Sequence, residues 1–270
     1  YITFKDTTEK FTVDTVLDLI FARSYGLSLG KFSKEELENE IKKYKDVVVH
    51  RFSYITDEYS GQKAIMNKDI LDVMEIKEGE YWLGLKKARF FSWFYPFANP
   101  HVEQPKESPS RAYLQMVEAF IWSNYKPEED EVALELGSAP GGASYAMVQR
   151  GIRVTGVDNA EMSETLLNHP LFTHIKEPMQ KVRDEHIPRP CHLLISDVNV
   201  MPSLNLSQVK RFMQLRPGIK NVFYTLKIGS KITVPEILEH AKTFKRFGFR
   251  EVGITQLPSS KSEILLFGKK

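Results

Sequence analysis

Residues 132–142 read Val-Ala-Leu-Glu-Leu-Gly-Ser-Ala-Pro-Gly-Gly, an apolar run that passes directly into a segment of small residues. The apolar part predicts a buried strand at Val132–Leu136, and a helical pattern begins at Ser144–Arg150. Between them, the small residues of 137–142 let the backbone approach a ligand closely at the start of a helix. The stretch therefore predicts a strand, a binding loop and a helix in succession.

Apolar runs alternate with helical patterns through the rest of the C-terminal half. Further strands are expected at 153–157, 192–196, 221–226, 249–256 and 263–267, and helices at 162–167, 206–215 and 235–247. This alternation predicts an α/β fold with a doubly wound, mainly parallel sheet covered by helices on both faces. No helix separates the last two strands, so we expect them to form an antiparallel hairpin at an edge of the sheet.

The chain divides at residues 97–109, which hold three prolines and almost no periodic hydrophobicity and are therefore read as a linker. Before it, helical patterns at Val13–Tyr25 and Lys34–Tyr44 precede β-rich runs at 47–54, 70–76 and 81–91. We therefore expect a small α+β domain over residues 1–96 and a larger α/β domain over residues 110–270.

Composition excludes several classes of protein. A chain of 270 residues with 42% hydrophobic content can bury a core, and its single cysteine, Cys191, can form neither an internal disulfide nor a CxxC site. No apolar run approaches the roughly 18 residues of a membrane span, and no signal segment is visible, so we expect a cytoplasmic protein. The histidines show no metal-ligand spacing with Cys191 or with one another, and no metal is expected.

Positive charge is concentrated at the C-terminal end. Residues 201–270 hold 13 Lys and Arg against 4 Asp and Glu, although the whole chain carries a formal net charge of only +2. Such a bias suits a polyanion such as RNA, because neutralising phosphates releases counterions. Solvated helix faces would explain it equally well.

The loop at 137–142 favours one class of cofactor. A dinucleotide fold would place G-x-G-x-x-G here, but Ala139-Pro140 occupies the middle of this loop. S-adenosylmethionine (SAM) has no phosphate, and its cationic groups suit an acid such as Glu135. Asp158 ends the next strand, where an acid commonly accepts hydrogen bonds from ribose hydroxyls, although a turn or capping role is the alternative. The predicted SAM site comprises Glu135, Gly137, Ser138, Ala139, Pro140, Gly141, Gly142 and Asp158.

Several short motifs recur in an order found in a known family. They are Ser108–Leu114, Pro140–Gly142, Val157-Asp158-Asn159, Ser196-Asp197, Leu226-Lys227 and Ser262-Glu263. Over about residues 80–270 the sequence resembles the FtsJ-like RNA ribose 2′-O-methyltransferases. The resemblance implies a Rossmann-like class I SAM-dependent methyltransferase domain, methyl transfer to a ribose 2′-hydroxyl, and RNA, specifically ribosomal RNA, as partner. It also implies a THUMP-like RNA-binding module in residues 1–96.

The family's active site is a Lys-Asp-Lys-Glu tetrad, and the resemblance places its last three members at Asp197, Lys227 and Glu263. Asp197 is also expected at the cofactor. The place of the first lysine falls on Gln115, which is uncharged. Arg111 lies four residues earlier on the same expected helix face, and both Arg111 and Gln115 are expected to contact RNA. The departure at Gln115 leaves a SAM- or RNA-binding protein with weakened or lost catalysis as an alternative, beside a small-molecule methyltransferase.

The three matched residues fall at strand ends, where a parallel sheet gathers residues that are distant in sequence. Each has an ordinary alternative: a cap for Asp197, a solvated side chain for Lys227, and an edge pair with Lys261 for Glu263. In a methyl transfer, we expect Lys227 to lie at the acceptor hydroxyl and help remove its proton. Burial would lower its pKa from about 10.4, whereas two neighbouring carboxylates would oppose that shift.

Overall fold

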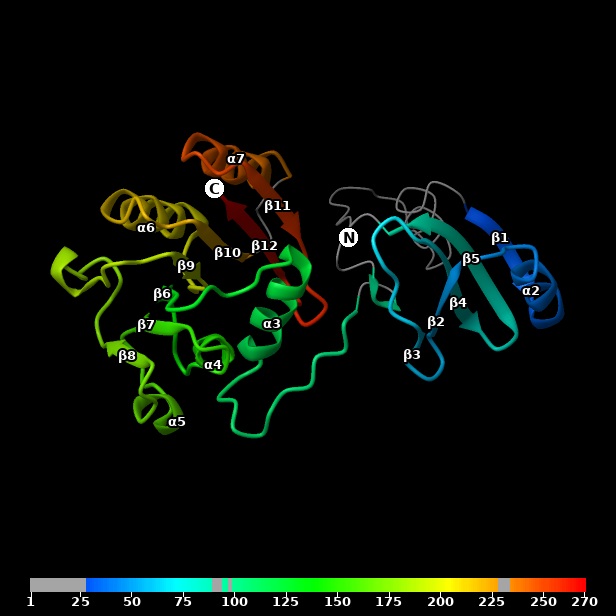
Figure 1. Ribbon diagram of the computed structural model, residues 1–270, viewed down its shortest axis with the longest axis horizontal. Coiled ribbons are helices and arrows are strands. Elements are labelled where there is room, and N and C mark those ends of the chain that lie inside the picture. Colours follow the sequence, from blue (N-terminus) through cyan, green and yellow to red (C-terminus); the bar gives the residue numbers. More distant parts are fainter. Residues whose placement is uncertain (1–27, 89–93, 97–98, 228–233) are drawn as a thin grey trace. The chain divides into compact units, whose positions relative to one another are not determined.

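The computed structural model describes residues 28–88, 94–96, 99–227 and 234–270 (Figure 1). The chain forms two compact units, Tyr1–His101 and Val102–Lys270, and each is described by itself. Within the described ranges, no helix is long and apolar enough to cross a membrane. The helical pattern at Val13–Tyr25 lies outside the described residues.

The first unit is built on a five-stranded sheet of order β1-β5-β4-β2-β3. Its elements are β1 (Ser28–Ser33), α2 (Lys34–Ile41), β2 (Val48–Ser53), β3 (Glu58–Gly61), β4 (Asp69–Lys77) and β5 (Glu80–Lys87). Ser33 caps α2 in a capping box with Glu36, and Leu37 packs from this helix into a core with Leu71, Val73 and Leu83. The unit is thus α+β.

The second unit is a seven-stranded sheet of order β11-β12-β10-β9-β6-β7-β8. Its strands are β6 (Val132–Leu136), β7 (Arg153–Val157), β8 (Phe172–Ile175), β9 (Leu193–Ser196), β10 (Asn221–Lys227), β11 (Glu251–Thr255) and β12 (Glu263–Lys269). Strands β8, β7, β6, β9 and β10 are parallel, whereas β12 is antiparallel to both β10 and β11. The carboxyl ends of the five parallel strands therefore meet at one edge.

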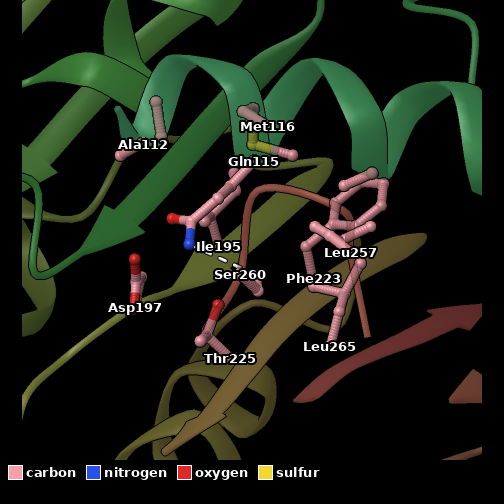
Figure 2. Close-up of a pocket in the computed structure, with 12 residues that line it drawn as sticks. Ala112, Gln115, Met116, Ile195, Asp197, Phe223, Thr225, Leu257, Ser260 and Leu265 are labelled. Atoms are coloured by element: carbon pink, nitrogen blue, oxygen red, sulfur yellow. Dashed lines mark hydrogen bonds between the residues drawn. The ribbon is translucent and has the colours of Figure 1, made fainter. Parts of the chain in front are cut away.

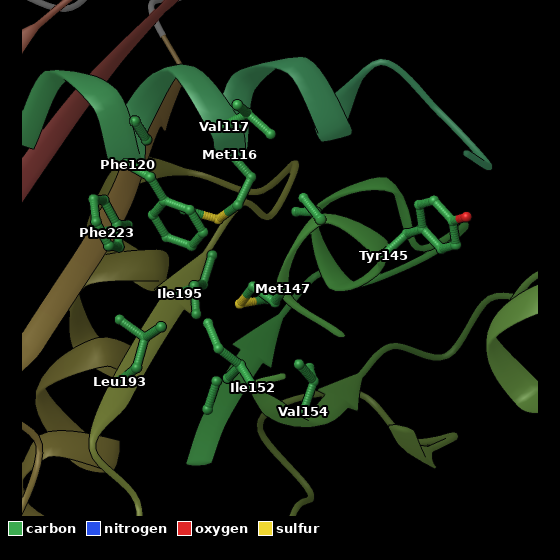
Figure 3. Close-up of a cluster of buried hydrophobic side chains, with 14 of the residues drawn as sticks. Met116, Val117, Phe120, Tyr145, Met147, Ile152, Val154, Leu193, Ile195 and Phe223 are labelled. Carbon is green, nitrogen blue, oxygen red and sulfur yellow. The ribbon is translucent and has the colours of Figure 1, made fainter. Parts of the chain in front are cut away.

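Helices cover both faces of this sheet (Figure 1). They are α3 (Ala112–Ser123), α4 (Gly142–Val148), α5 (Glu164–Leu167), α6 (Pro202–Leu215) and α7 (Val234–Arg246), with a 3₁₀ turn at Asp184–His186. Successive strand residues point to opposite faces, so Ala133 packs with α3 and α4 while Leu134 packs with α6 and α7. Figure 3 shows the first of these two cores, with Met116, Phe120 and Phe223 gathered beneath α3.

The predicted fold class is confirmed, including the antiparallel pairing of the last two strands at the sheet edge. The sequence missed β1, β3 and β8, which are four to six residues long and carry little hydrophobic pattern. The helix expected at 162–167 is shorter than expected, because α5 begins only at Glu164. Both differences concern elements too short for periodicity to mark.

Helix α6 offers a matched test of the packing. Phe212 is fully buried among side chains of the α6–α7 face, whereas Leu204, on the same helix, is 37% exposed. We expect Phe212→Ala to lower the free energy of unfolding by about 3–5 kcal/mol, because a cavity remains where the ring was. Leu204→Ala should change it by less than about 0.5 kcal/mol in the same urea titration. Equal effects would show that the described packing is wrong.

Candidate active site

The loop that follows β6 is shaped by two glycines. Gly137 and Gly141 have φ angles of +79° and +116°, which side-chain-bearing residues rarely adopt. A β-carbon on Gly137 would also collide with the carbonyl oxygen of Asp197, the residue that follows β9. The loop after β6 and the loop after β9 therefore approach each other backbone to backbone, and α4 begins immediately afterwards at Gly142.

Glu135 lies beneath this loop and is only 2% exposed. Its Oε2 accepts a hydrogen bond from the hydroxyl of Ser144, in the first turn of α4. Burial raises the pKa of Glu135 to about 8, and the negative charges of Asp197 and Asp158 add to the shift that the Ser144 bond opposes. With this pKa Glu135 is mostly protonated at neutral pH, and a cation bound beside it would favour its ionised form.

Asp158 follows β7 and ties that strand end to the same loop. Its Oδ2 accepts a hydrogen bond from the backbone amide of Ala139 at 3.0 Å, and its Oδ1 accepts one from Ala160 at 2.9 Å. The second bond is the local turn expected of an aspartate after a strand. The first reaches across 19 residues of sequence and fixes the carboxylate beside the loop. Asp158 therefore has both the structural role and the position predicted for it.

Asp197, Lys227 and Glu263 lie together at the carboxyl end of the sheet. The Nζ atom of Lys227 lies 2.6 Å from Oδ1 of Asp197 and donates a hydrogen bond to Oε1 of Glu263. The sheet register creates this meeting, because Lys227 at the end of β10 pairs with Glu263 at the start of β12. We call these three residues the trio; the structure places them in contact, as the resemblance implies.

The sequence left open whether burial or the neighbouring carboxylates dominate the pKa of Lys227, and the geometry gives the direction of the shift. Burial alone lowers the pKa of Lys227, but the Asp197 and Glu263 carboxylates outweigh it and hold the pKa above its ordinary value. Burial raises the pKa of the Asp197 carboxyl, Lys227 opposes that rise without cancelling it, and Glu263 adds the smallest contribution to the rise. The trio thus holds a stable ammonium between two carboxylates.

Gln115 reaches the trio from α3. Its Nε2 donates a hydrogen bond to Oε2 of Glu263 at 2.7 Å. It also donates one to the hydroxyl of Ser260 at 3.2 Å, which Figure 2 shows. Gln115 therefore makes a neutral contact with Glu263 where the family pattern has a lysine. Arg111 is exposed just before α3, and among the described residues no hydrogen bond or ion pair joins its side chain to the trio.

A pocket lies beside Asp197, and its lining combines polar side chains on one side with apolar side chains on the other (Figure 2). It is lined by Ala112, Gln115, Met116, Ala119, Ala143, Ile195, Asp197, Phe223, Thr225, Leu257, Ser260 and Leu265. Sequence reasoning missed the pocket and its hydroxyl groups. It also missed Glu118, which is buried one turn beyond Gln115 and accepts hydrogen bonds from the amide and hydroxyl of Ser259 at 3.0 and 2.7 Å. Its helical spacing from Gln115 was the available signal.

Metal ligands are not gathered at this site. Among the residues that the structure describes, no group of three or more His, Cys, Asp and Glu side chains could hold a metal ion.

A seven-stranded sheet with these loops and this trio defines a class I methyltransferase architecture. The family description of FtsJ-like methyltransferases matches residues 109–263, more than half of the chain. The chain belongs to the FtsJ-like methyltransferase family. The resemblance seen in the sequence is thereby confirmed.

Two curated relatives extend the match toward the N-terminus. Ribosomal RNA large subunit methyltransferase M of Pseudomonas syringae pv. tomato is 30% identical over 207 residues, which are 71% of this chain and 56% of the relative. The protein of the same name from Azoarcus sp. is 28% identical over 211 residues, covering 73% and 56%. The chain thus spans a little over half the length of these relatives.

Among solved structures, a protein from Lactococcus lactis described as a candidate hemolysin matches with a TM-score of 0.50 and 18% identity. The match covers 60% of this chain and 88% of that one. At this identity it shows the shared fold alone.

The raised pKa of Glu135 predicts how the stability of the protein depends on pH. Its pKa in the folded protein, about 8, lies above its ordinary value of 4.5, so the folded state binds the proton more tightly than the unfolded state. Stability should therefore fall as pH rises from 4.5 toward 8. Glu135→Gln cannot ionise but keeps an acceptor for Ser144. The melting temperature of this variant should therefore rise relative to that of the wild type as the pH increases across this range. A difference that stays constant with pH would contradict the assigned burial.

Proposed function

We propose that this chain transfers the methyl group of SAM to a ribose 2′-hydroxyl of RNA, with ribosomal RNA as the substrate class. The observation that carries the proposal is the trio, in which Lys227 contacts Asp197 and Glu263 at the strand ends, beside the loop after β6. Family membership and the names of the curated relatives support the reaction and the substrate. A ribosomal RNA substrate also favours the cytoplasm as its place of action.

The residues present fit SAM chemically. The cofactor supplies a methyl group on a cationic sulfur, and that cation would favour the ionised forms of the buried acid Glu135 and of Asp197. Asp158 is fixed at the end of β7, where an acid binds ribose hydroxyls. We propose that Glu135, the backbone of 137–142, Asp158 and Asp197 hold the cofactor.

The trio is proposed as the catalytic group. Methyl transfer is an in-line displacement, so the acceptor oxygen must be held in one position while its proton leaves. Lys227 is itself fixed by two carboxylates, and a fixed ammonium can hold an oxygen without reorganising. We propose that Lys227 contacts the acceptor oxygen, while Asp197 and Glu263 fix Lys227.

RNA contacts are proposed for the α3 side of the site. Arg111 is exposed just before α3, and an arginine can bind a phosphate bidentately, while Gln115 of α3 lines the pocket. The positive excess of residues 201–270 favours RNA over a small-molecule acceptor. The THUMP-like reading of residues 1–96 stays a prediction.

A second candidate function is supported by Gln115 alone. Its amide, rather than a cation, contacts Glu263, so the trio and Gln115 together hold one positive and two negative charges. A chain with this balance could bind SAM and RNA while catalysing poorly. Turnover on RNA separates the two candidates.

The first test removes the ammonium. Lys227→Met should abolish methyl transfer to ribosomal RNA while leaving the affinity for SAM, measured by calorimetry, nearly unchanged. Asp158→Ala is the matched variant, because it should weaken SAM binding without touching the trio. Full activity of the methionine variant would remove Lys227 from catalysis, and failure of the wild type to bind SAM would refute the proposed function. Free nucleosides in the same assay identify a small-molecule enzyme.

The second test restores the missing charge. Gln115→Lys places an ammonium within reach of Glu263, which Gln115 already contacts at 2.7 Å. We expect turnover on RNA to rise by about tenfold, equivalent to roughly 1.4 kcal/mol of transition-state stabilisation. Arg111→Ala should weaken RNA binding more than SAM binding. A rate that is unchanged or lower in Gln115→Lys would show that position 115 is not a defective catalytic position.

A further inference from the structure

The connection between β11 and β12 lies against α3 and lines the pocket. It comprises residues 256–262, and we call it the strap. Two of its residues, Leu257 and Ser260, line the pocket together with residues of α3 (Figure 2). Loosening the strap from α3 would therefore change the shape of the pocket.

Two hydrogen-bonded attachments hold the strap to α3. The hydroxyl of Ser260 accepts a hydrogen bond from Nε2 of Gln115 at 3.2 Å, and Ser259 donates two hydrogen bonds to Glu118. Gln115 and Glu118 are three residues apart on the helix and share a face, and their partners are consecutive in the strap. This pair of attachments fixes both the position and the orientation of Ser260.

The strap is also supported from within and from the strand before it. Nε2 of Gln256 donates a hydrogen bond to the carbonyl oxygen of Lys261 at 2.9 Å, which joins the two ends of the strap. Leu257 is buried in the core beneath α3. In β11, Gly253 lies so close to Trp122 of α3 that a β-carbon would collide with the indole ring. The strap thus has a defined place against the helix.

Glu118 depends on the strap for its hydrogen bonds. Its side chain is buried, and the amide and the hydroxyl of Ser259 both donate to one oxygen, Oε2, at 3.0 and 2.7 Å. Burial raises the pKa of Glu118, and the two hydrogen bonds oppose that rise. If the strap moved away, a buried carboxyl group would lose both donors, which is costly. Glu118 therefore favours the position in which the strap lies against α3.

Ser260 retains a donor for a ligand. A serine hydroxyl has one proton to donate and two acceptor sites, and Ser260 uses one acceptor site for Gln115. Among the described residues, no hydrogen-bond acceptor receives the proton of this hydroxyl. The hydroxyl belongs to a residue that lines the pocket with Asp197 and can bind an oxygen of a molecule there.

We propose that Ser260 binds the acceptor nucleotide by donating a hydrogen bond to one of its oxygens, and that Glu118 positions Ser260 by holding the strap against α3. The inference rests on the proposed function and adds two residues to the acceptor side of that site. Ser260 contacts the substrate, whereas Glu118 is a positioning residue that acts through Ser259 and the strap.

The trio is held independently of Glu118. Lys227 and Glu263 are paired by the register of β10 with β12, and Asp197 follows β9. Loosening the strap should therefore leave the catalytic groups in place. We expect it to weaken the binding of RNA while largely preserving the chemical step.

The test is steady-state methyl transfer from SAM to unmodified large-subunit ribosomal RNA transcribed in vitro, with kcat and the KM for RNA determined separately. Ser260→Ala should raise the KM by about tenfold, equivalent to about 1.4 kcal/mol for one lost hydrogen bond. Its kcat should stay within about threefold of wild type, because the trio is untouched. Its affinity for SAM, measured by calorimetry, should be unchanged.

Two variants of Glu118 separate positioning from the loss of a charge. Glu118→Ala removes both hydrogen bonds to Ser259 and should raise the KM about tenfold. Glu118→Gln keeps an oxygen that can accept both of them, so its KM should stay within about threefold of wild type. The double variant with Ser260→Ala should lie within about threefold of the single variants, because Glu118 acts through Ser260.

Ser123→Ala is the matched control on α3. The Ser123 hydroxyl donates within the helix, to the carbonyl oxygens of Ala119 and Phe120 at 2.7 and 3.4 Å. The variant loses a side-chain hydrogen bond of α3 while the Glu118 and Gln115 attachments remain. We expect its KM for RNA to equal that of the wild type.

Every other outcome counts against the inference. A wild-type KM in Ser260→Ala overturns it, as does a loss confined to kcat. It is also overturned if Glu118→Gln is as impaired as Glu118→Ala, if the two alanine substitutions have additive effects, or if Ser123→Ala raises the KM equally. Should Glu118→Ala not fold, Ser260→Ala and Glu118→Gln still decide. No methyl transfer by the wild type would instead refute the proposed function.

Discussion

The parallel pairing of β9 with β6 on one side and β10 on the other is the constraint on which the site depends. It brings Leu136 beside Ser196, and Ser196 beside Tyr224, so that the next residues of each chain segment emerge at one edge. Asp197 and the loop at 137–142 therefore become neighbours although 60 residues separate Gly137 from Asp197 in sequence. The collision expected for any β-carbon at Gly137 measures how close that approach is.

Around this edge the electrostatics are uneven. Glu135, Asp158, Asp197 and Glu263 bring four acids to the carboxyl end of the sheet, and Lys227 is the cation paired with two of them. Burial removes the water that would solvate an ionised carboxylate, which is why the pKa values of Glu135 and Asp197 rise. A cationic ligand would favour the ionised forms of these acids, and a sulfonium is such a cation.

Sequence alone was sufficient for the fold class because its main apolar runs and helical patterns were clear. The run at Val132–Leu136 and the helical pattern inside Pro202–Leu215 mark their elements without tertiary information. The sequence did not predict short strands such as β8, since four residues of which two are polar show too little hydrophobic pattern. For the site, strand-end positions and family resemblance together indicated Asp197, Lys227 and Glu263. Neither could reveal that Gln115 donates a hydrogen bond to the second carboxylate oxygen of Glu263, because the two residues are 148 positions apart in sequence.

The proposed acceptor of the methyl group is a ribose 2′-oxygen of RNA. A methylated 2′-oxygen cannot attack the neighbouring phosphate, so the linkage survives alkaline hydrolysis and remains in a dinucleotide. The most direct measurement incubates the chain with large-subunit ribosomal RNA and methyl-labelled SAM, digests the RNA in alkali, and separates the products. Transfer to a ribose 2′-oxygen would leave the label in alkali-resistant dinucleotides. Label recovered in mononucleotides would place the methyl group on a base and contradict it.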